Sequence, residues 1–84
     1  MPTLSEIIKQ DARYMQRVSI SREVGTGAII ISDTTGYRED IYLQGDDADQ
    51  FVLNQGRVWG EAGDVSMDEV AKHLARPYAE SIWS

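Results

Sequence analysis

The segment RVSISREVGTGAIIISDTTGYREDIYLQ, residues 17–44, decides the fold, because the spacing of its apolar side chains changes at its start from a helical period to a period of two. Val18, Ile20 and Val24 alternate with polar residues. A strand with one buried face shows this alternation, since successive side chains point to opposite faces of a sheet. We therefore expect strands in this segment.

Two glycine-containing sequences mark the turns of the segment. Gly25 and Thr26 are the Gly-first pair of a two-residue type II′ hairpin turn. The sequence DTTG ends with Gly36, which suits the left-handed position of a longer turn. The segment then divides into three strands joined as an antiparallel meander, at about residues 17–24, 27–33 and 37–44.

The central strand carries three consecutive isoleucines, Ile29, Ile30 and Ile31. Adjacent strand residues point to opposite faces, so this strand is apolar on both. A small sheet covered by helices on one side does not require that pattern. We expect the second face to be covered too, by the chain itself or by a partner.

Helical periodicity replaces the alternation before the strands. In residues 3–16, apolar side chains recur every three or four positions, with Asp11 as the one polar exception. Thr3 and Glu6 have the spacing of a capping box, in which each side chain accepts a free amide of the first turn. We expect a helix over about residues 3–16.

A second helix is expected from residue 47, where Asp47 and Gln50 again have capping-box spacing. Gly56 in its interior costs about 1 kcal/mol relative to alanine. One helical stripe, apolar except for Gln55, comprises Ala48, Phe51, Val52, Gln55, Val58, Trp59 and Ala62.

A third helix is expected to open with a capping box of Ser66 and Glu69. Pro77 predicts a kink or a restart rather than an end, because the apolar stripe keeps its phase across it. The stripe comprises Met67, Val70, Ala71, Leu74, Ala75, Tyr78, Ala79 and Ile82.

The order α-β-β-β-α-α predicts an α+β fold, in which a three-stranded antiparallel meander packs against helices. With 84 residues, the chain is too short to divide its apolar side chains between two cores, so we expect a single globular domain over residues 1–84. The chain has no cysteine, which removes disulfides and thiolate chemistry. No apolar run reaches the roughly 20 residues that span a bilayer, and no signal-peptide pattern is present, so the expected compartment is the cytoplasm.

The net charge of −6 is unevenly distributed. Residues 1–32 carry four basic and three acidic side chains, whereas residues 33–84 carry four basic and eleven acidic ones. An acidic surface repels nucleic acid and anionic lipid and attracts proteins with basic grooves. We expect no direct binding to nucleic acid or membrane, and a protein partner with a basic surface.

Asp46, Asp47 and Asp49 follow the last strand and admit three interpretations. The favoured one is a helix N-terminus, where a side-chain oxygen caps a free amide and the charge opposes the helix dipole. A calcium loop starting at Asp46 or Asp47 would lack the required glycine and glutamate. The third interpretation is a negative surface that a partner recognises. We expect no metal and no cofactor.

Catalysis has little support in the sequence. The only histidine, His73, is expected on the solvated side of the last helix, opposite its apolar stripe. Glu39 and Asp40 are a poor acid–base pair, because adjacent strand residues point to opposite faces. No nucleophile motif or phosphate-binding loop accompanies them. We expect no enzyme activity and no catalytic residue.

The aromatic side chains divide into two groups. Trp59 and Tyr78 fall on helical stripes and are expected in the core. Tyr37 and Tyr42 on the last strand, and Trp83 near the C-terminus, are candidates for partner contacts. The alternative is packing, with Tyr42 on the second sheet face and Trp83 closing the core under the last helix.

These features favour a small acidic, non-enzymatic inhibitor or adaptor that occupies a basic nucleic-acid-binding groove, with carboxylates in place of phosphates. In size, acidity and lack of catalytic residues, the chain resembles the small phage- or plasmid-encoded anti-CRISPR and anti-restriction proteins. The resemblance is of general character and involves no shared motif. The expected contact residues are Tyr37, Glu39, Asp40, Tyr42, Asp46, Asp47, Asp49, Glu61, Asp64, Asp68, Glu69, Glu80 and Trp83.

Two alternatives remain. The first is a homo-oligomeric structural or accessory protein, such as a homodimer, that associates through an apolar sheet face formed by Ile29, Ile30 and Ile31. The second is a small enzyme or ligand binder that uses carboxylates, which is the least favoured.

Overall fold

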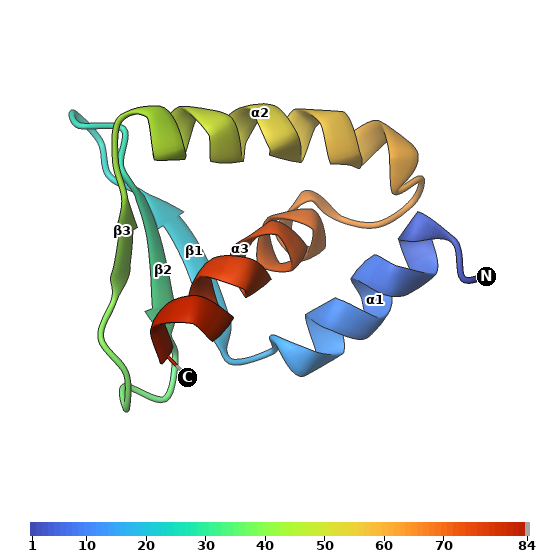
Figure 1. Ribbon diagram of the computed structural model, residues 1–84, viewed down its shortest axis with the longest axis horizontal. Coiled ribbons are helices and arrows are strands. Elements are labelled where there is room, and N and C mark those ends of the chain that lie inside the picture. Colours follow the sequence, from blue (N-terminus) through green and yellow to red (C-terminus); the bar gives the residue numbers. More distant parts are fainter. Residues whose placement is uncertain (84) are drawn as a thin grey trace.

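The computed structural model describes residues 1–83, and its helices and strands follow the predicted order (Figure 1). The expected α+β fold with a three-stranded antiparallel meander is confirmed. The molecule measures 35 × 26 × 18 Å. Its elements are α1 (Leu4–Tyr14), β1 (Val18–Arg22), β2 (Ile29–Asp33), β3 (Ile41–Leu43), α2 (Asp46–Glu61) and α3 (Met67–Trp83).

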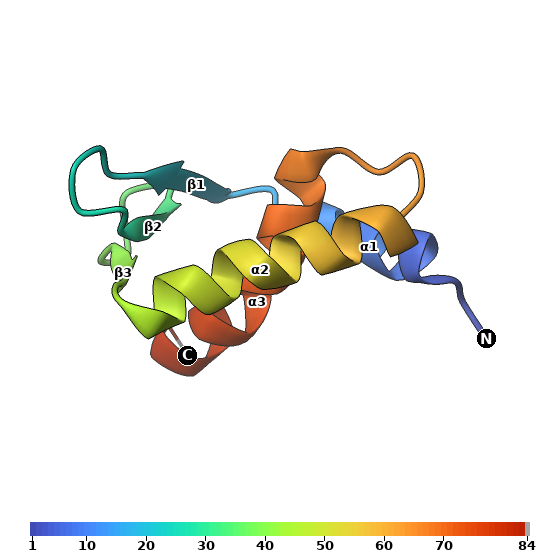
Figure 2. The same cartoon turned by 90° about the horizontal axis from the view of Figure 1, so that it is seen from above.

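The sheet has the order β1-β2-β3, and the helices lie on one side of it (Figures 1 and 2). Ile31 pairs with Ile20 on β1 and with Ile41 on β3, and its side chain is 0% exposed beneath the helices. Ile30 points to the other face, where it pairs with Tyr42 and is half-buried. Among the described residues, no helix covers that face, so the chain itself does not provide the expected cover, and cover by a partner stays a prediction.

The helix α3 lies between α1 and α2 and packs against both, as well as against β1 and β3 (Figure 1). The larger apolar cluster joins the sheet to α2 and α3 and includes Ile31 and Phe51. A smaller cluster joins α1 to the α2–α3 connection and includes Ile8, Val65 and Val70. Among residues 1–83, no helix combines the length and the apolar character that crossing a bilayer requires.

One of the three predicted capping boxes is complete, and a second forms one of its two hydrogen bonds. The hydroxyl of Thr3 accepts a hydrogen bond from the Glu6 amide, and the Glu6 carboxylate accepts one from the Thr3 amide, each at 3.2 Å. The Ser66 hydroxyl accepts one from the Glu69 amide at 3.2 Å. Helix α3 does not end at Pro77 but continues to Trp83, as the phase of its apolar stripe predicted.

The connection between β1 and β2 is longer than the predicted two-residue turn. Four residues, 24–27, separate Glu23 from Ala28, and the Glu23 amide donates to the Ala28 carbonyl at 2.9 Å. The Gly27 amide donates to the Glu23 carbonyl at 3.0 Å, which closes the loop. Two glycines with positive φ permit this wider loop. Val24 therefore lies exposed at its tip and not on the buried face of a strand.

The third strand is shorter than predicted, because residues 34–40 form a loop. The loop begins with the predicted turn, in which Gly36 has a φ of 77°. Near its end, the Glu39 carbonyl accepts a hydrogen bond from Nε1 of Trp83 at 2.8 Å. That carbonyl is thus satisfied by a side chain and not by a neighbouring strand. Tyr37, Glu39 and Asp40 therefore lie in a loop.

Several residues of the predicted apolar stripes are exposed. On α2, Ala48 and Phe51 are buried, but Val52 and Trp59 are exposed, so the prediction that Trp59 lies in the core is wrong. Helix α2 lies along the border of the molecule, so only a narrow part of its stripe meets α3 and the sheet (Figure 1). The end positions of the α3 stripe, Met67 and Ile82, are exposed as well.

Candidate functional site

Five of the predicted acidic contact residues border β3, and none of them makes an ion pair with a described residue. Glu39 and Asp40 precede the strand, and Asp46, Asp47 and Asp49 lie in the first turn of α2 that follows it. All five are exposed. The loop before β3 and the start of α2 lie at opposite ends of the strand (Figure 1). The five carboxylates therefore flank the edge strand β3 at both of its ends.

The aspartates of this segment do not cap α2 with their side chains. The N-cap residue is Gly45, with a φ of 58° and no side-chain hydrogen bond, so the predicted capping box of Asp47 and Gln50 is wrong. Glycine takes that position because the backbone conformation there disfavours a side chain. The three carboxylates still lie near the positive end of the helix dipole, but their oxygens accept no capping hydrogen bond.

The other predicted acidic contacts lie away from the β3 edge. Glu61, Asp64, Asp68 and Glu69 lie at the end of α2, in the connection that follows it and at the start of α3, and Glu80 lies near the end of α3. Three of these more distant carboxylates are paired with bases of the same chain. The pairs are Asp64 with Lys9 at 3.6 Å, Asp68 with Lys72 at 3.0 Å, and Glu80 with Arg76 at 2.8 Å.

The three aromatic candidates differ in their surroundings. Tyr37 in the loop is 91% exposed, and Tyr42 on the outer face of β3 is 54% exposed. Trp83 is half-buried and packs against the larger core cluster. The guanidinium of Arg38 lies 5.6 Å from the centre of the Trp83 ring, within cation–π range. Trp83 thus closes the core at the end of α3 and holds the loop before β3.

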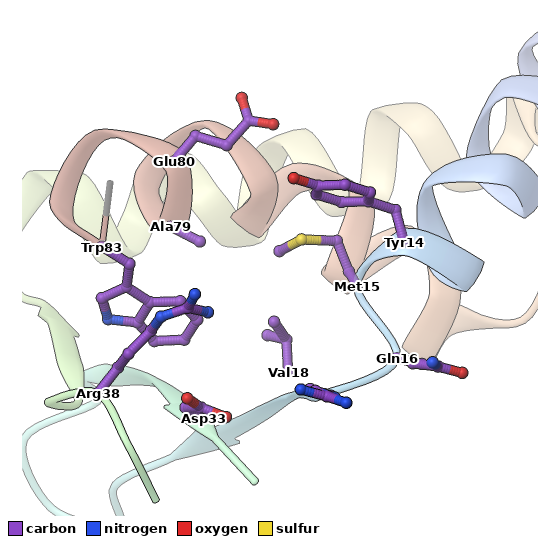
Figure 3. Close-up of a pocket in the computed structure, with 10 residues that line it drawn as sticks. Tyr14, Met15, Gln16, Val18, Asp33, Arg38, Ala79, Glu80 and Trp83 are labelled. Carbon is purple, nitrogen blue, oxygen red and sulfur yellow. The ribbon is translucent and has the colours of Figure 1, made fainter. Parts of the chain in front are cut away.

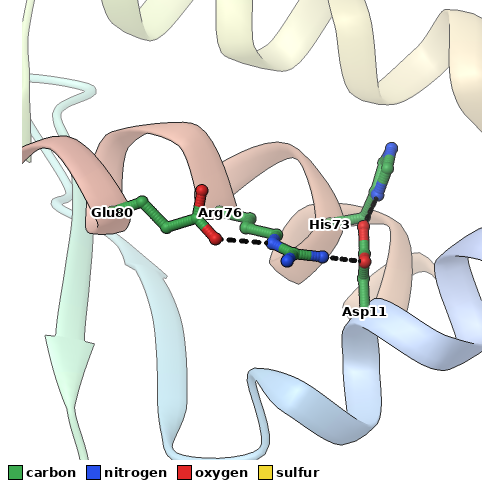
Figure 4. Close-up of polar contacts among 4 residues, drawn as sticks. All are labelled: Asp11, His73, Arg76 and Glu80. Carbon is green, nitrogen blue, oxygen red and sulfur yellow. Dashed lines mark hydrogen bonds and ion pairs between the residues drawn. The ribbon is translucent and has the colours of Figure 1, made fainter.

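A polar network that joins α1 to α3 was not predicted (Figure 4). Asp11 is 6% exposed, and its carboxylate accepts hydrogen bonds from Nδ1 of His73 and from Nη1 of Arg76. Nε of Arg76 donates to Glu80 at 2.8 Å, and this hydrogen bond raises the pKa of Arg76 above its ordinary value. The guanidinium also lies 4.8 Å from the centre of the Tyr14 ring.

His73 is therefore not the solvated surface residue that its helical position predicted. Its side chain is 24% exposed and is held by Asp11. The only signal in the sequence was Asp11, the one polar residue on the apolar stripe of the first helix. A buried carboxylate requires a partner, but the sequence does not say which base approaches it.

A cavity of about 360 Å³ opens beside this network between α2 and α3, and its lining includes His73, Asn54 and Tyr78. The Asp11 carboxylate orients the imidazole of His73, as a general base is oriented in many enzymes. Within residues 1–83, however, no three His, Cys, Asp or Glu side chains gather closely enough to hold a metal ion.

A second cavity, of about 400 Å³, lies between the end of α1, β1, the loop after β2 and the last turns of α3 (Figure 3). Its walls combine apolar and charged side chains, including Met15, Val18, Trp83, Arg17, Arg38 and Asp33. Oδ1 of Asp33 accepts hydrogen bonds from the Thr35 hydroxyl at 2.6 Å and from the Thr35 amide at 2.9 Å. These bonds, and to a smaller extent the charges of Arg38 and Arg17, lower the pKa of Asp33.

The two cavities and the β3 edge are the features from which a function can be argued, because comparison with known proteins supplies none. The chain matches no protein-family model, no curated protein and no solved structure.

Proposed function

We propose that this protein is a small acidic, non-enzymatic inhibitor or adaptor that binds a protein with a basic surface through its β3 edge. The partner is a nucleic-acid-handling protein, and the β3 edge occupies its basic groove in place of nucleic acid, as an anti-CRISPR or anti-restriction inhibitor would. The β3 edge consists of Tyr37, Glu39, Asp40, Tyr42, Asp46, Asp47 and Asp49.

The observation that carries this proposal is the state of the five carboxylates of the β3 edge. They are exposed, and none of them is paired with a base among residues 1–83, whereas Asp64, Asp68 and Glu80 are paired within the chain. Unpaired carboxylates keep their acceptor oxygens available for the lysine and arginine side chains of a partner. Such side chains respond mainly to charge and spacing, so carboxylates can stand in for phosphates.

Two further features of the β3 edge favour protein binding. Tyr37 and Tyr42 are exposed aromatic residues, and tyrosine is enriched in the centres of protein interfaces. In addition, β3 is an edge strand, with one side unpaired in the sheet. Its backbone groups there are available to an extended segment of a partner.

The test compares the wild type with two variants that lose the same charge at different places. The edge variant carries Glu39→Gln, Asp40→Asn, Asp46→Asn, Asp47→Asn and Asp49→Asn. The matched control variant carries Glu61→Gln, Asp64→Asn, Asp68→Asn, Glu69→Gln and Glu80→Gln. We expect both variants to fold, because surface ion pairs contribute little to stability. Circular dichroism checks this.

Each tagged protein is used to capture partners from a cell lysate, which are eluted with a salt gradient and identified by mass spectrometry. We expect the wild type and the control variant to capture a nucleic-acid-binding protein that elutes at moderate salt, because salt screens exposed charges. The wild type should also displace nucleic acid from that purified partner, and the edge variant should not. Capture by the edge variant, or binding that persists in about 1 M salt, would contradict the proposal.

A second candidate function, self-association through the sheet, is favoured by one pair of residues. Ile30 and Tyr42 are paired on the sheet face that no helix covers. The prediction that all three isoleucines form this surface is wrong for Ile29 and Ile31, because both are buried under the helices. Sedimentation velocity tests this candidate: the wild type should dimerise at micromolar concentration and the Ile30→Asp variant should be monomeric. A wild type that stays monomeric at about 1 mM would rule it out.

A further inference from the structure

We infer that the cavity beside Trp83 binds a monocarboxylate carried on an apolar body, either a small organic acid or the C-terminus of a peptide. We call this site the Trp83 cavity and define it by Met15, Arg17, Val18, Asp33, Arg38 and Trp83 (Figure 3). The site adjoins the β3 edge, because Arg38 lies between Tyr37 and Glu39, but the inference does not depend on the partner proposed for that edge.

Two arginines supply the recognition of the carboxylate. Arg17 and Arg38 both line the Trp83 cavity, and neither forms an ion pair with another residue in the described part of the chain. Arg76, in contrast, is bound to two carboxylates. A guanidinium presents its N–H donors in a planar fork that matches the two oxygens of a carboxylate. The indole of Trp83 holds the Arg38 guanidinium against the wall of the cavity, 5.6 Å from the ring centre.

The charge in the cavity favours a singly charged ligand. Asp33 faces the two arginines, but its Oδ1 is occupied by two hydrogen bonds from Thr35, and it forms no ion pair with either guanidinium. Glu80, which also lines the cavity, is paired with Arg76. Arg17 and Arg38 together with Asp33 give the cavity a net charge of +1. One bound monoanion would neutralise that charge. A phosphate dianion would meet repulsion from Asp33 and from the net charge of −6.

The apolar walls supply the rest of the binding surface. Met15 and Val18 are each 5% exposed, and together with Ala79 and the indole of Trp83 they surround the cavity (Figure 3). The volume of about 400 Å³ lies in the range of small-molecule sites, which combine apolar walls with a few polar groups that fix orientation. An aryl or alkyl body is expected against these walls, with its carboxylate at the arginines.

The experiment uses the fluorescence of Trp83 itself. The chain has two tryptophans, so Trp59→Phe leaves Trp83 as the only indole reporter. This protein is titrated with 3-phenylpropanoate, which does not absorb at the excitation wavelength of tryptophan, and with the neutral 3-phenylpropanamide. For a ligand of this size we expect a saturable change in Trp83 emission with a Kd of about 1 mM. The amide should bind about tenfold more weakly, because it lacks the charge that the arginines recognise.

Three substitutions in the Trp59→Phe background locate the site. Arg17→Gln and Arg38→Gln should each weaken 3-phenylpropanoate binding about tenfold, because each removes one charged fork. Arg57→Gln is the matched control, since Arg57 is exposed on α2 and does not line the cavity. It should leave the Kd unchanged. Circular dichroism checks that all three variants fold.

The outcomes separate the two sources of the carboxylate and can overturn the inference. A tripeptide that ends in phenylalanine and binds more tightly than 3-phenylpropanoate, but not when amidated, identifies a peptide C-terminus. Weaker binding of that peptide identifies a small acid. Equal binding of acid and amide, unchanged affinity in both arginine variants, or displacement of the probe by an equal concentration of inorganic phosphate would overturn the inference. So would the absence of any change in Trp83 emission or in backbone amide NMR shifts at about 10 mM probe.

Discussion

The carboxylate of Asp11 on α1 and Nδ1 of His73 on α3 are joined by a hydrogen bond across 62 residues of sequence. Arg76, one turn further along α3, donates to the other oxygen of the same carboxylate. A buried carboxylate with two basic partners is satisfied only when the two helices meet in one register, so the network specifies how α1 packs on α3.

Replacement of Asp11 by alanine should therefore destabilise the fold. The Asp11→Ala variant loses both hydrogen bonds, which leaves His73 without this acceptor and Arg76 with Glu80 alone, so we expect the free energy of unfolding to fall by about 2 kcal/mol. Urea denaturation measures this change. Asp49→Ala, which removes an exposed carboxylate of α2, should change stability by less than about 0.5 kcal/mol. Equal effects of the two substitutions would show that the network contributes nothing.

Lowering the pH should reduce the free energy of unfolding, in part because the Asp33 carboxylate becomes protonated. Because the folded protein holds the pKa of Asp33 below its ordinary value of 3.8, the ionised carboxylate stabilises the fold at any pH above that value. This contribution is lost as the pH falls through the lower folded pKa. The free energy of unfolding, measured by urea denaturation over a series of pH values, should therefore decrease less steeply below about pH 4 in Asp33→Asn than in the wild type. Parallel curves for the two proteins would contradict this account.

The two faces of β2 should respond in opposite ways to a charge. Ile31 is fully buried, and an unpaired carboxylate in its place costs several kcal/mol, which is comparable to the whole stability of a small domain. We expect Ile31→Asp to be unfolded. Ile30 lies on the uncovered face, so Ile30→Asp should remain folded, with a thermal midpoint close to that of the wild type. Circular dichroism distinguishes the two, and a folded Ile31→Asp would show that the inward face is assigned incorrectly.

The glycine inside α2 offers a stabilising substitution. A Cβ atom at Gly56 would meet nothing within 4 Å, and the backbone there is helical. Gly56→Ala should raise the free energy of unfolding by about 0.5–1 kcal/mol, because alanine loses less conformational freedom in a helix. Gly45→Ala is the opposite case, since a φ of 58° disfavours a side chain even though the space around it is open. It should destabilise the protein in the same denaturation assay.

The sequence by itself determined the element order, because that order depends on local periodicity. The change from a period of 3.6 to a period of 2 after residue 16, and back again near residue 46, reports which segments bury one side of a helix or a strand. The capping box of Thr3 and Glu6 and the left-handed turn at Gly36 were also predictable, since each depends on residues close together in the chain.

Local rules failed where distant contacts compete with them. Gly45 caps α2 in place of Asp47, and Trp59 is exposed although it falls on an apolar stripe. The stripe shows which side of a helix is apolar, but the width that is buried depends on how many neighbours the helix meets.

Only the tertiary structure decided which side chains meet. Asp11 meets His73, and Arg17, Arg38 and Trp83 come together around one cavity, although they belong to separate parts of the chain. The five carboxylates of the β3 edge remain unpaired among the described residues for the same reason, since Lys9, Lys72 and Arg76 pair with other carboxylates. Periodicity is a local average along the chain, whereas these encounters are set by how the faces of different elements pack, and the sequence pattern contains no direct record of that packing.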